Sequence, residues 1–234
     1  MLEVRDIEAR YGHLQVLWGI SLHVAQGEFV TLVGPNGAGK TTTLRTIAGL
    51  IKPMAGEVEF MGKPIGGLPA NRISQMGLSF VTEDLDLFEQ MSVRENLLLG
   101  AYGIRDKDKL ASSMDFVLDL FPRLAERQKQ LAGTLSGGER KMLALARGLV
   151  SDPKVLLVDE PSLGLAPLLV ESVFEALQAL HQKGVTILLV EQNVGTALQM
   201  TERSYVLEQG RIVLQGAGAE LLQDEHVKSA YLGI

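Results

Sequence analysis

The stretch FVTLVGPNGAGKT, residues 29–41, constrains the fold of this chain more than any other feature. Residues 29–33 read as a short apolar strand buried on both faces, of the kind found in parallel sheets. A glycine-rich loop follows, and residues 40–50 then have the character of a helix. Gly34, Gly39, Lys40 and Thr41 fit the pattern G-x-x-x-x-G-K-[S/T], and the strand–loop–helix context is the one that this pattern requires. The stretch therefore predicts a Walker A loop, which binds phosphate.

Each part of this loop has an expected role. Its glycines let backbone N–H groups point at a phosphate, and the helix N-terminus adds a favourable dipole. Lys40 is expected to place its charge on the β- and γ-phosphates, Thr41 to ligate Mg²⁺ and Thr42 to hydrogen-bond phosphate. A chance glycine-rich turn is the alternative, and the order of strand, loop and helix argues against it. The candidate nucleotide-binding residues of the loop are Gly34, Pro35, Asn36, Gly37, Ala38, Gly39, Lys40, Thr41 and Thr42.

A second apolar strand, in KVLLVDE, ends in two carboxylates, Asp159 and Glu160. Residues at the carboxyl end of a parallel strand face the ligand crevice of such a sheet. Asp159 is expected to hold Mg²⁺ through water, and Glu160 to polarise the water that attacks the phosphate. The alternative for Glu160 is a solvated strand end.

Strands and helices alternate along most of the chain, which predicts an α/β fold with a parallel sheet. The first thirty residues read as antiparallel strands, and residues 91–150 carry helical periodicity. The stretch PLLVESVFEALQALHQKG predicts a helix that ends at Gly184, and RSYVLEQGRIVLQG predicts a hairpin turning near Gln209 and Gly210. Residues 217–232 are expected to be helical. No internal repeat or linker is evident.

Composition excludes several classes of protein. With 46% hydrophobic residues in 234, the chain can bury a sizeable core, and with no cysteine it has neither disulfides nor thiolate metal sites. A net charge of −6 argues against a nucleic-acid binder. The first ten residues do not resemble a signal peptide, and no apolar run approaches the roughly 20 residues that span a bilayer. These features favour a soluble cytoplasmic protein that reaches a membrane only through a partner.

A second candidate anion site lies at Leu135–Glu139, LSGGE, at the start of a predicted helix. Ser136 can cap the helix, and Gly137 and Gly138 leave backbone N–H groups bare. The Walker A loop is already expected to enclose the chain's own nucleotide. A two-fold head-to-tail dimer would let this helix end close on the partner's nucleotide. A plain capped helix is the alternative.

With LSGGE between the Walker A loop and VLLVDE, the chain resembles the ATP-binding subunits of ABC transporters over essentially its whole length. The resemblance implies a P-loop NTPase (RecA-like) core with an antiparallel β subdomain, together formed by residues 1–85 and 151–234. It also implies an inserted helical subdomain at about 86–150, which carries the signature residues Ser136, Gly137, Gly138 and Glu139. Two such subunits would sandwich two ATP molecules.

The resemblance marks further positions. Tyr11 matches the aromatic residue that stacks on adenine, with Val16 beside it; the alternative for Tyr11 is an edge-strand aromatic. Glu83 occupies the position where the family usually has a glutamine that senses Mg²⁺ and contacts the membrane subunits. Residues 163–166, LGLA, replace the family's usual Ser-Ala-Leu-Asp, so the acidic residue of that loop is missing.

The stretch LVEQN, residues 189–193, follows the last parallel strand. The family usually places a histidine switch here, and alignment puts Gln192 in its place. Gln192 has no titratable proton, so it is expected to orient water and the γ-phosphate without acting as an acid or base. The alternative is a polar strand end. Lys40, Glu160 and Gln192 are thus the catalytic candidates, and Thr41, Asp159 and Glu83 the metal candidates.

Five features together resemble the LivF-type ATPases of branched-chain (hydrophobic) amino-acid importers: VDEPSLGLAP, LVEQN, LFPRLAER, VKSAYLG and Glu83. That branch implies a second ABC ATPase subunit, two membrane permease subunits, a periplasmic binding protein and a place on the cytoplasmic face of the inner membrane. A related branch serves urea and short amides. Residues 82–85, TEDL, replace the usual Pro-Glu-Gly-Arg in a segment that faces the permease.

Two other classes of function remain open. A soluble ABC-type ATPase that acts on ribosomes or DNA usually has two nucleotide domains or a long coiled coil, and this chain has neither. A module that binds ATP without hydrolysing it is disfavoured by the intact Lys40, Asp159 and Glu160. The permease contact is expected near residues 83–96.

Overall fold

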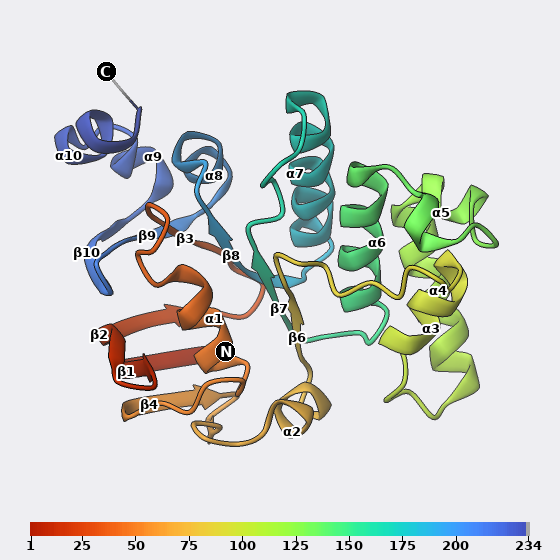
Figure 1. The fold of residues 1–234 in the computed structure, drawn as a ribbon, viewed down its shortest axis with the longest axis horizontal. Coiled ribbons are helices and arrows are strands. Elements are labelled where there is room, and N and C mark those ends of the chain that lie inside the picture. Colours follow the sequence, from red (N-terminus) through yellow and green to blue (C-terminus); the bar gives the residue numbers. More distant parts are fainter. Residues whose placement is uncertain (233–234) are drawn as a thin grey trace.

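Two β-sheets meet at the predicted phosphate-binding loop in the computed structural model, which describes residues 1–232 (Figure 1). The first sheet is antiparallel and has the order β2-β1-β4-β5. Its strands are β1 (Leu2–Tyr11), β2 (Leu14–Val24), β4 (Ala55–Phe60) and β5 (Lys63–Pro64). Alternating burial at the start of β1 places Leu2 and Val4 in the core, as the alternating sequence predicts, and a register shift between Val4 and Ile7 then moves the buried positions to Ile7 and Ala9.

The second sheet runs through the middle of the molecule in the order β10-β9-β3-β8-β7-β6. Its strands are β3 (Phe29–Val33), β6 (Leu78–Val81), β7 (Val155–Asp159), β8 (Thr186–Glu191), β9 (Arg203–Glu208) and β10 (Arg211–Gly216). Every neighbouring pair from β9 to β6 is parallel, and β9 and β10 form an antiparallel hairpin. The predicted α/β class is therefore confirmed.

Register brings the ends of three strands to one edge of this sheet. Val33 pairs with Glu191, and Asp159 pairs with Val190. Strand β8 consequently lies between the strand that precedes the phosphate loop and the strand that carries Asp159. The residues that follow β3, β7 and β8 all emerge at this edge.

The helices mostly follow the expectations from periodicity. They are α1 (Lys40–Ile47), α2 (Ala70–Gln75), α3 (Val93–Gly100), α4 (Lys107–Leu120), α5 (Pro122–Glu126), the 3₁₀ turn η1 (Ala132–Thr134), α6 (Gly137–Leu149), α7 (Pro167–Gln182) and α8 (Val194–Met200). Neither α2 nor α5 was predicted as a separate helix, because helices this short show no repeated apolar face. In α2 only Ile73 is buried.

Helices α3–α6 form the right-hand part of Figure 1, and all of them lie within residues 86–150. Ser92 starts α3 with a capping box, and the Asp106 side chain caps α4. One continuous apolar cluster joins Leu143 and Leu145 of α6 to Leu156 of β7 and Leu189 of β8. The helical subdomain therefore shares its core with the parallel sheet, and the subdomain limits remain predictions.

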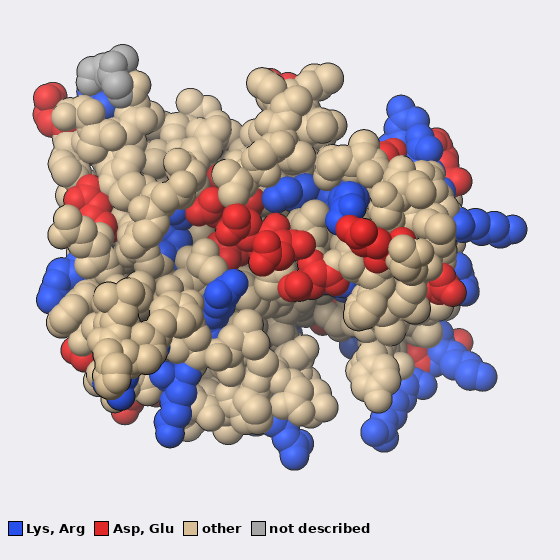
Figure 2. Space-filling view, viewed as in Figure 1, with Lys and Arg blue, Asp and Glu red and all other residues tan. Residues whose placement is uncertain are grey.

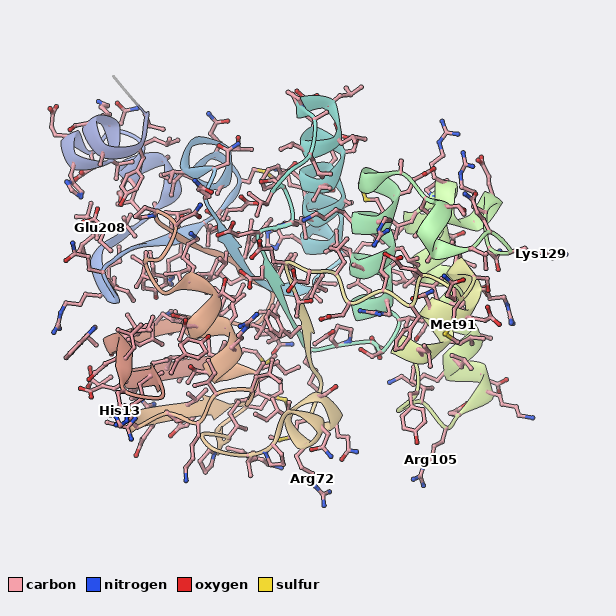
Figure 3. All side chains as sticks on the ribbon, in the orientation of Figure 1. His13, Arg72, Met91, Arg105, Lys129 and Glu208 are labelled. Carbon is pink, nitrogen blue, oxygen red and sulfur yellow. The ribbon has the colours of Figure 1, made fainter. Side chains whose placement is uncertain are left out.

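The expected C-terminal helix is broken into three pieces within the described residues: α9 (Gly218–Leu221), α10 (Glu225–Val227) and a π turn, η2 (Lys228–Leu232). Asp224 interrupts the run because its side chain caps a new helix start. The carboxylate of Glu208, labelled in Figure 3, receives hydrogen bonds from Tyr231 and His226, which hold these pieces against β9. Gly233 of the VKSAYLG motif lies outside the described residues. Within residues 1–232, no helix is both long and apolar enough to cross a membrane.

The β9–β10 turn joins the two sheets at the phosphate loop. The Gly210 N–H donates to the carbonyl oxygen of Ala38 at 2.8 Å, and the Trp18 N–H donates to the Gly210 carbonyl oxygen at 2.9 Å. Gly210 has φ +75°, and a Cβ there would lie 1.9 Å from the Val16 carbonyl oxygen. Only glycine fits this position, because it needs both a left-handed backbone and a very close approach.

We expect Gly210→Ala to destabilise the protein by about 2–4 kcal/mol, because the added methyl group collides with the β2 backbone. Gly62→Ala is the matched control, since Gly62 also has a positive φ but nothing lies within 4 Å of its Cβ position. The control should lose only about 1–2 kcal/mol. Urea unfolding of both variants measures the difference, and equal losses would contradict the collision.

Candidate nucleotide-binding site

The phosphate loop connects β3 to α1 and is shaped by its last glycine. Gly39 precedes α1 with φ +109°, and a Cβ there would lie 2.8 Å from Leu17 Cδ2 of β2. The loop can therefore wrap tightly around the start of α1 only with glycine at this position. Backbone N–H groups at a helix start, together with the helix dipole, favour an anion, so the loop fits a phosphate group.

Lys40 points into the loop rather than into solvent. Its Nζ donates to the carbonyl oxygens of Gly34 at 2.9 Å and Pro35 at 3.1 Å, and it lies 2.9 Å from Oε1 of Glu160. Both side chains of the Lys40–Glu160 ion pair are buried. A phosphate in the loop would offer the Lys40 ammonium the same kind of anionic partner at the same place.

Thr41 and Asp159 meet across the site. The Thr41 hydroxyl donates to Oδ1 of Asp159 at 3.1 Å. Burial raises the pKa of Asp159 to about 6; the Thr41 hydrogen bond opposes this shift, and the charge of Glu160 adds to it. A buried carboxylate beside a hydroxyl is a set of oxygen donors that suits Mg²⁺, and binding a cation would relieve the cost of burying this charge. No group of three or more acidic, histidine or cysteine side chains able to hold a metal occurs in residues 1–232, so water and phosphate oxygens would complete the coordination.

Glu160 has an unusual backbone for a residue other than glycine. Its φ is +43°, in the left-handed region. The Glu160 N–H donates to the Val190 carbonyl oxygen at 2.9 Å, and the Leu163 N–H donates to the Glu160 carbonyl oxygen at 3.2 Å. Strained conformations of this kind cluster at functional sites, where the surrounding structure holds them. The left-handed backbone at Glu160 directs its side chain back toward Lys40.

Three polar residues, Glu191–Asn193, lie at the end of β8, and Glu191 has a structural role that was not predicted from the sequence. The Glu191 carboxylate is almost completely buried and accepts hydrogen bonds from Ser162 N at 3.0 Å and Ser162 Oγ at 2.8 Å. It also accepts from the backbone N–H groups of Gln192 and Asn193. Burial raises its pKa, and these hydrogen bonds oppose the shift. Glu191 thus connects the loop after Glu160 to the start of α8. The available sequence signal was its place directly after the apolar run VTILLV.

Gln192 and Asn193 differ from Glu191 in exposure. The Gln192 side chain is exposed at the edge of the sheet where Lys40, Asp159 and Glu160 converge, which is the placement expected for a switch residue. Asn193 caps α8 by accepting a hydrogen bond from Thr196 N at 3.3 Å. The role of Gln192 remains a prediction.

Glu83 lies on the loop that follows β6. Val81 pairs with Val158, so this loop starts beside the end of β7. Glu83 is exposed, and its charge contributes to the raised pKa of Asp159. Figure 2 shows Asp and Glu side chains gathered across the middle of this face, where the strands end in Figure 1. That negative field would attract a cation.

The LSGGE segment forms the start of α6. Ser136 caps the helix, and the Glu139 carboxylate returns to Ser136 N at 2.9 Å and lies 3.0 Å from Arg127 Nε. Glu139 therefore stabilises the helix start in this structure. Gly138 is buried against Leu169 of α7, whereas Ser136 and Gly137 are exposed. The exposed turn is thus available to a ligand outside the chain's own phosphate loop.

The two residues expected to contact adenine lie on the antiparallel sheet. Tyr11 ends β1 opposite Leu14 and is 44% exposed. Val16 on β2 is partly buried, and its Cγ1 would be 3.5 Å from a Cβ on Gly39. Val16 is therefore next to the phosphate loop, and Tyr11 lies farther out at the end of the β1–β2 hairpin.

Lys141 was also missed, because a lysine in an amphipathic helix normally faces solvent. Here it is buried, and its Nζ donates to the carbonyl oxygen of Glu160 at 3.3 Å. Burial lowers the pKa of Lys141, and the nearby carboxylates, Glu191 first, oppose this shift.

We expect Glu191→Ala to cost about 2–4 kcal/mol of folding free energy, because it removes a buried carboxylate and leaves partly buried donors of Ser162 and Gln192 without an acceptor. Glu171→Ala, on the exposed face of α7, is the control and should change stability by less than about 0.5 kcal/mol. Chemical denaturation of both variants measures this. A loss below about 1 kcal/mol for Glu191→Ala would show that water replaces the carboxylate at little cost.

Comparison with known proteins places this site in a family. The model of the family described as "ABC transporter" matches residues 17–163. The chain is 47% identical over its full length to the high-affinity branched-chain amino acid transport ATP-binding protein BraG of Pseudomonas aeruginosa, and covers 100% of that protein. It is 37% identical to the probable branched-chain amino acid transport ATP-binding protein LivF of Archaeoglobus fulgidus, with 100% of this chain and 99% of that protein covered.

A solved structure agrees with the fold over the whole chain. The ADP conformation of MJ1267, described as an ATP-binding cassette of an ABC transporter, superposes with a TM-score of 0.87 at 28% identity, covering 100% of this chain and 99% of that one. The predicted P-loop fold and the resemblance to ABC ATPases are both confirmed. The chain therefore belongs to the ABC transporter family, whose members couple ATP hydrolysis to transport.

Proposed function

We propose that this chain hydrolyses ATP to energise the uptake of branched-chain (hydrophobic) amino acids through partner permeases. The single observation that supports the substrate assignment is the full-length similarity to BraG at 47% identity. The contacts of Lys40 with Glu160 and of Thr41 with Asp159 support the ATPase half of the proposal. The ATPase subunit itself has no contact with the amino acid in this scheme.

The chain's own residues divide the catalytic work. The loop N–H groups and Lys40 bind the phosphates, which releases the Glu160 carboxylate from its ion pair. Glu160 Oε1 then accepts a hydrogen bond from the attacking water and takes its proton. Gln192 orients the water and the γ-phosphate. Mg²⁺, held by Thr41 and Asp159 with Glu83 nearby, would supply positive charge to the phosphates.

The second half of each site comes from another subunit in this proposal. Ser136, Gly137 and Gly138 would contact the nucleotide of a second ABC ATPase subunit, and Tyr11 with Val16 the adenine of the chain's own nucleotide. The exposed Ser136–Gly137 turn supports this, because it is open to a partner. Ala166 stands where the family usually has an acidic residue, so the contact which that residue makes across the interface is not expected from Ala166.

The permeases would bind at the groove between the parallel sheet and the helical subdomain. A cavity of about 340 Å³ lies there, lined by residues that include Leu50, Phe80, Thr82 and Arg147. Arg147 donates to the carbonyl oxygens of Leu85 and Asp86, so it fixes the loop that carries Glu83. A permease in this groove would therefore act on the nucleotide site through that loop. The chain would sit at the cytoplasmic face of the inner membrane, with a periplasmic binding protein delivering the substrate.

Uptake in a deletion strain tests the substrate. Loss of labelled leucine and valine uptake, restored by the wild-type gene, supports the proposal. Loss of urea or short-amide uptake with leucine uptake intact would assign the chain to that alternative branch. A tagged chain that recovers ribosomes or DNA, and no permease, would instead indicate a soluble ABC ATPase.

We expect Glu160→Gln to bind Mg-ATP within about threefold of wild type and to lower turnover by roughly 10²–10⁴-fold, because the amide cannot take a proton from water. Phosphate release by the assembled transporter and equilibrium nucleotide binding measure the two effects. Wild-type turnover in this variant would remove Glu160 from the catalytic role. A wild-type assembly that binds ATP but releases no phosphate would favour a binding module.

We expect Gln192→Ala to lower ATP turnover about tenfold while nucleotide affinity stays nearly unchanged, because the side chain orients groups without transferring a proton. Gln199→Ala, at an exposed glutamine in α8, the helix that follows Gln192, is the control. Steady-state kinetics of the assembled transporter give kcat and KM for each. If both variants turn over ATP at the wild-type rate, Gln192 only ends the strand.

A further inference from the structure

Lys141 is a buried cation that none of the roles above uses. It lies in the second turn of α6, the helix that starts at the LSGGE segment, and its side chain is almost completely buried. Burying an ammonium group is costly unless it is paired and hydrogen-bonded. A lysine kept in such a place therefore has specific partners.

The partner atom of Lys141 is the backbone of the catalytic candidate. Its Nζ donates to the Glu160 carbonyl oxygen at 3.3 Å, across 19 residues of sequence. That carbonyl belongs to the peptide that follows the left-handed turn at Glu160, where φ is +43°. The carboxylates of Glu191, Glu83, Glu160 and Asp159 all act favourably on the Lys141 charge.

Glu160 is consequently held at two points by two buried lysines. Lys40 pairs with its carboxylate, and Lys141 holds its carbonyl oxygen. The two lysines come from different places: Lys40 belongs to the phosphate loop, and Lys141 belongs to the signature helix of the other subdomain. Only the first of these contacts involves the phosphate loop.

The start of α6 is packed so that its position determines the position of Lys141. Gly138 lies against Leu169, and the capping box of Ser136 and Glu139 stabilises the first turn. Lys141 lies five positions after Ser136, a rise of about 7.5 Å along the helix. A shift at the exposed Ser136–Gly137 turn therefore moves Lys141 with it.

We propose that Lys141 is a positioning residue that couples the signature helix α6 to Glu160, so that engagement of α6 by the nucleotide of a second subunit aligns the glutamate in this one. The inference rests on the proposed role of Glu160 in orienting water. It assigns Lys141 no contact with ATP. Lys141 acts through the Glu160 backbone alone.

The test uses the assembled transporter and asks whether Lys141 acts through Glu160. Lys141→Met removes the charge and the donor at similar length, and we expect kcat to fall at least tenfold with KM and nucleotide affinity within threefold of wild type. In a Glu160→Gln background the same substitution should change the residual single-turnover rate by less than threefold, because the group it positions is gone. Lys129→Met is the matched control, since Lys129 is exposed at the outer rim of the helical subdomain (Figure 3).

Other outcomes have definite meanings. An equal loss from Lys141→Met in both backgrounds, or a kcat within threefold of wild type, overturns the inference. If Lys141→Met does not fold, Lys141→Leu, which also removes the donor and the charge, is judged by the same comparison. If Glu160→Gln alone hydrolyses ATP at a near-normal rate, the role of Glu160 is refuted. If Glu160→Gln blocks hydrolysis and Lys141→Met hydrolyses ATP at the wild-type rate, only the positioning role of Lys141 is refuted.

Discussion

The buried ion pair between Lys40 and Glu160 is the interaction around which the site is organised. Both groups are buried in low dielectric, where an unpaired charge is very costly, so each requires a compensating partner. The Lys40 ammonium also satisfies two carbonyl oxygens of the phosphate loop. The pair thus links the loop after β3 to the end of β7 across the intervening strand β8. In the proposed function a phosphate replaces Glu160 as the partner of Lys40, and this exchange would link nucleotide binding to the freeing of the candidate base, Glu160.

Parallel register makes this pair possible. Val33, Asp159 and Glu191 end neighbouring strands at one edge of the sheet, so residues more than a hundred positions apart in sequence meet within hydrogen-bonding distance. The β9–β10 turn supports the same edge from the side, because Gly210 bonds to Ala38 of the loop and to Trp18 of the antiparallel sheet. Two buried groups, Glu191 and Lys141, then hold the strained loop at Glu160 from β8 and from α6.

Much of this was predictable from the chain alone, for reasons that differ between elements. The phosphate loop, the strand that ends at Asp159 and Glu160, the capped helix at Ser136 and the Gln209–Gly210 hairpin were all predicted, because each depends on local patterns of apolar residues, glycines and caps. The short helices α2 and α5 were not, and the expected C-terminal helix is broken at Asp224. In these short segments tertiary packing outweighs a weak local preference.

The sequence by itself determined the chemistry of the protein: a phosphate loop with Lys40 and Thr41, a strand-end pair Asp159–Glu160 and a signature helix, in an order found in ABC ATPases. Only the tertiary structure decided which contacts each residue of the last polar stretch, Glu191–Asn193, makes. Glu191 turns inward to bind Ser162, Gln192 stays exposed at the rim and Asn193 caps α8. It likewise decided that Lys141 is buried against Glu160 rather than solvated. Local patterns cannot reveal such partners, because the burial and hydrogen bonding of a polar side chain depend on groups that the fold brings from distant parts of the chain.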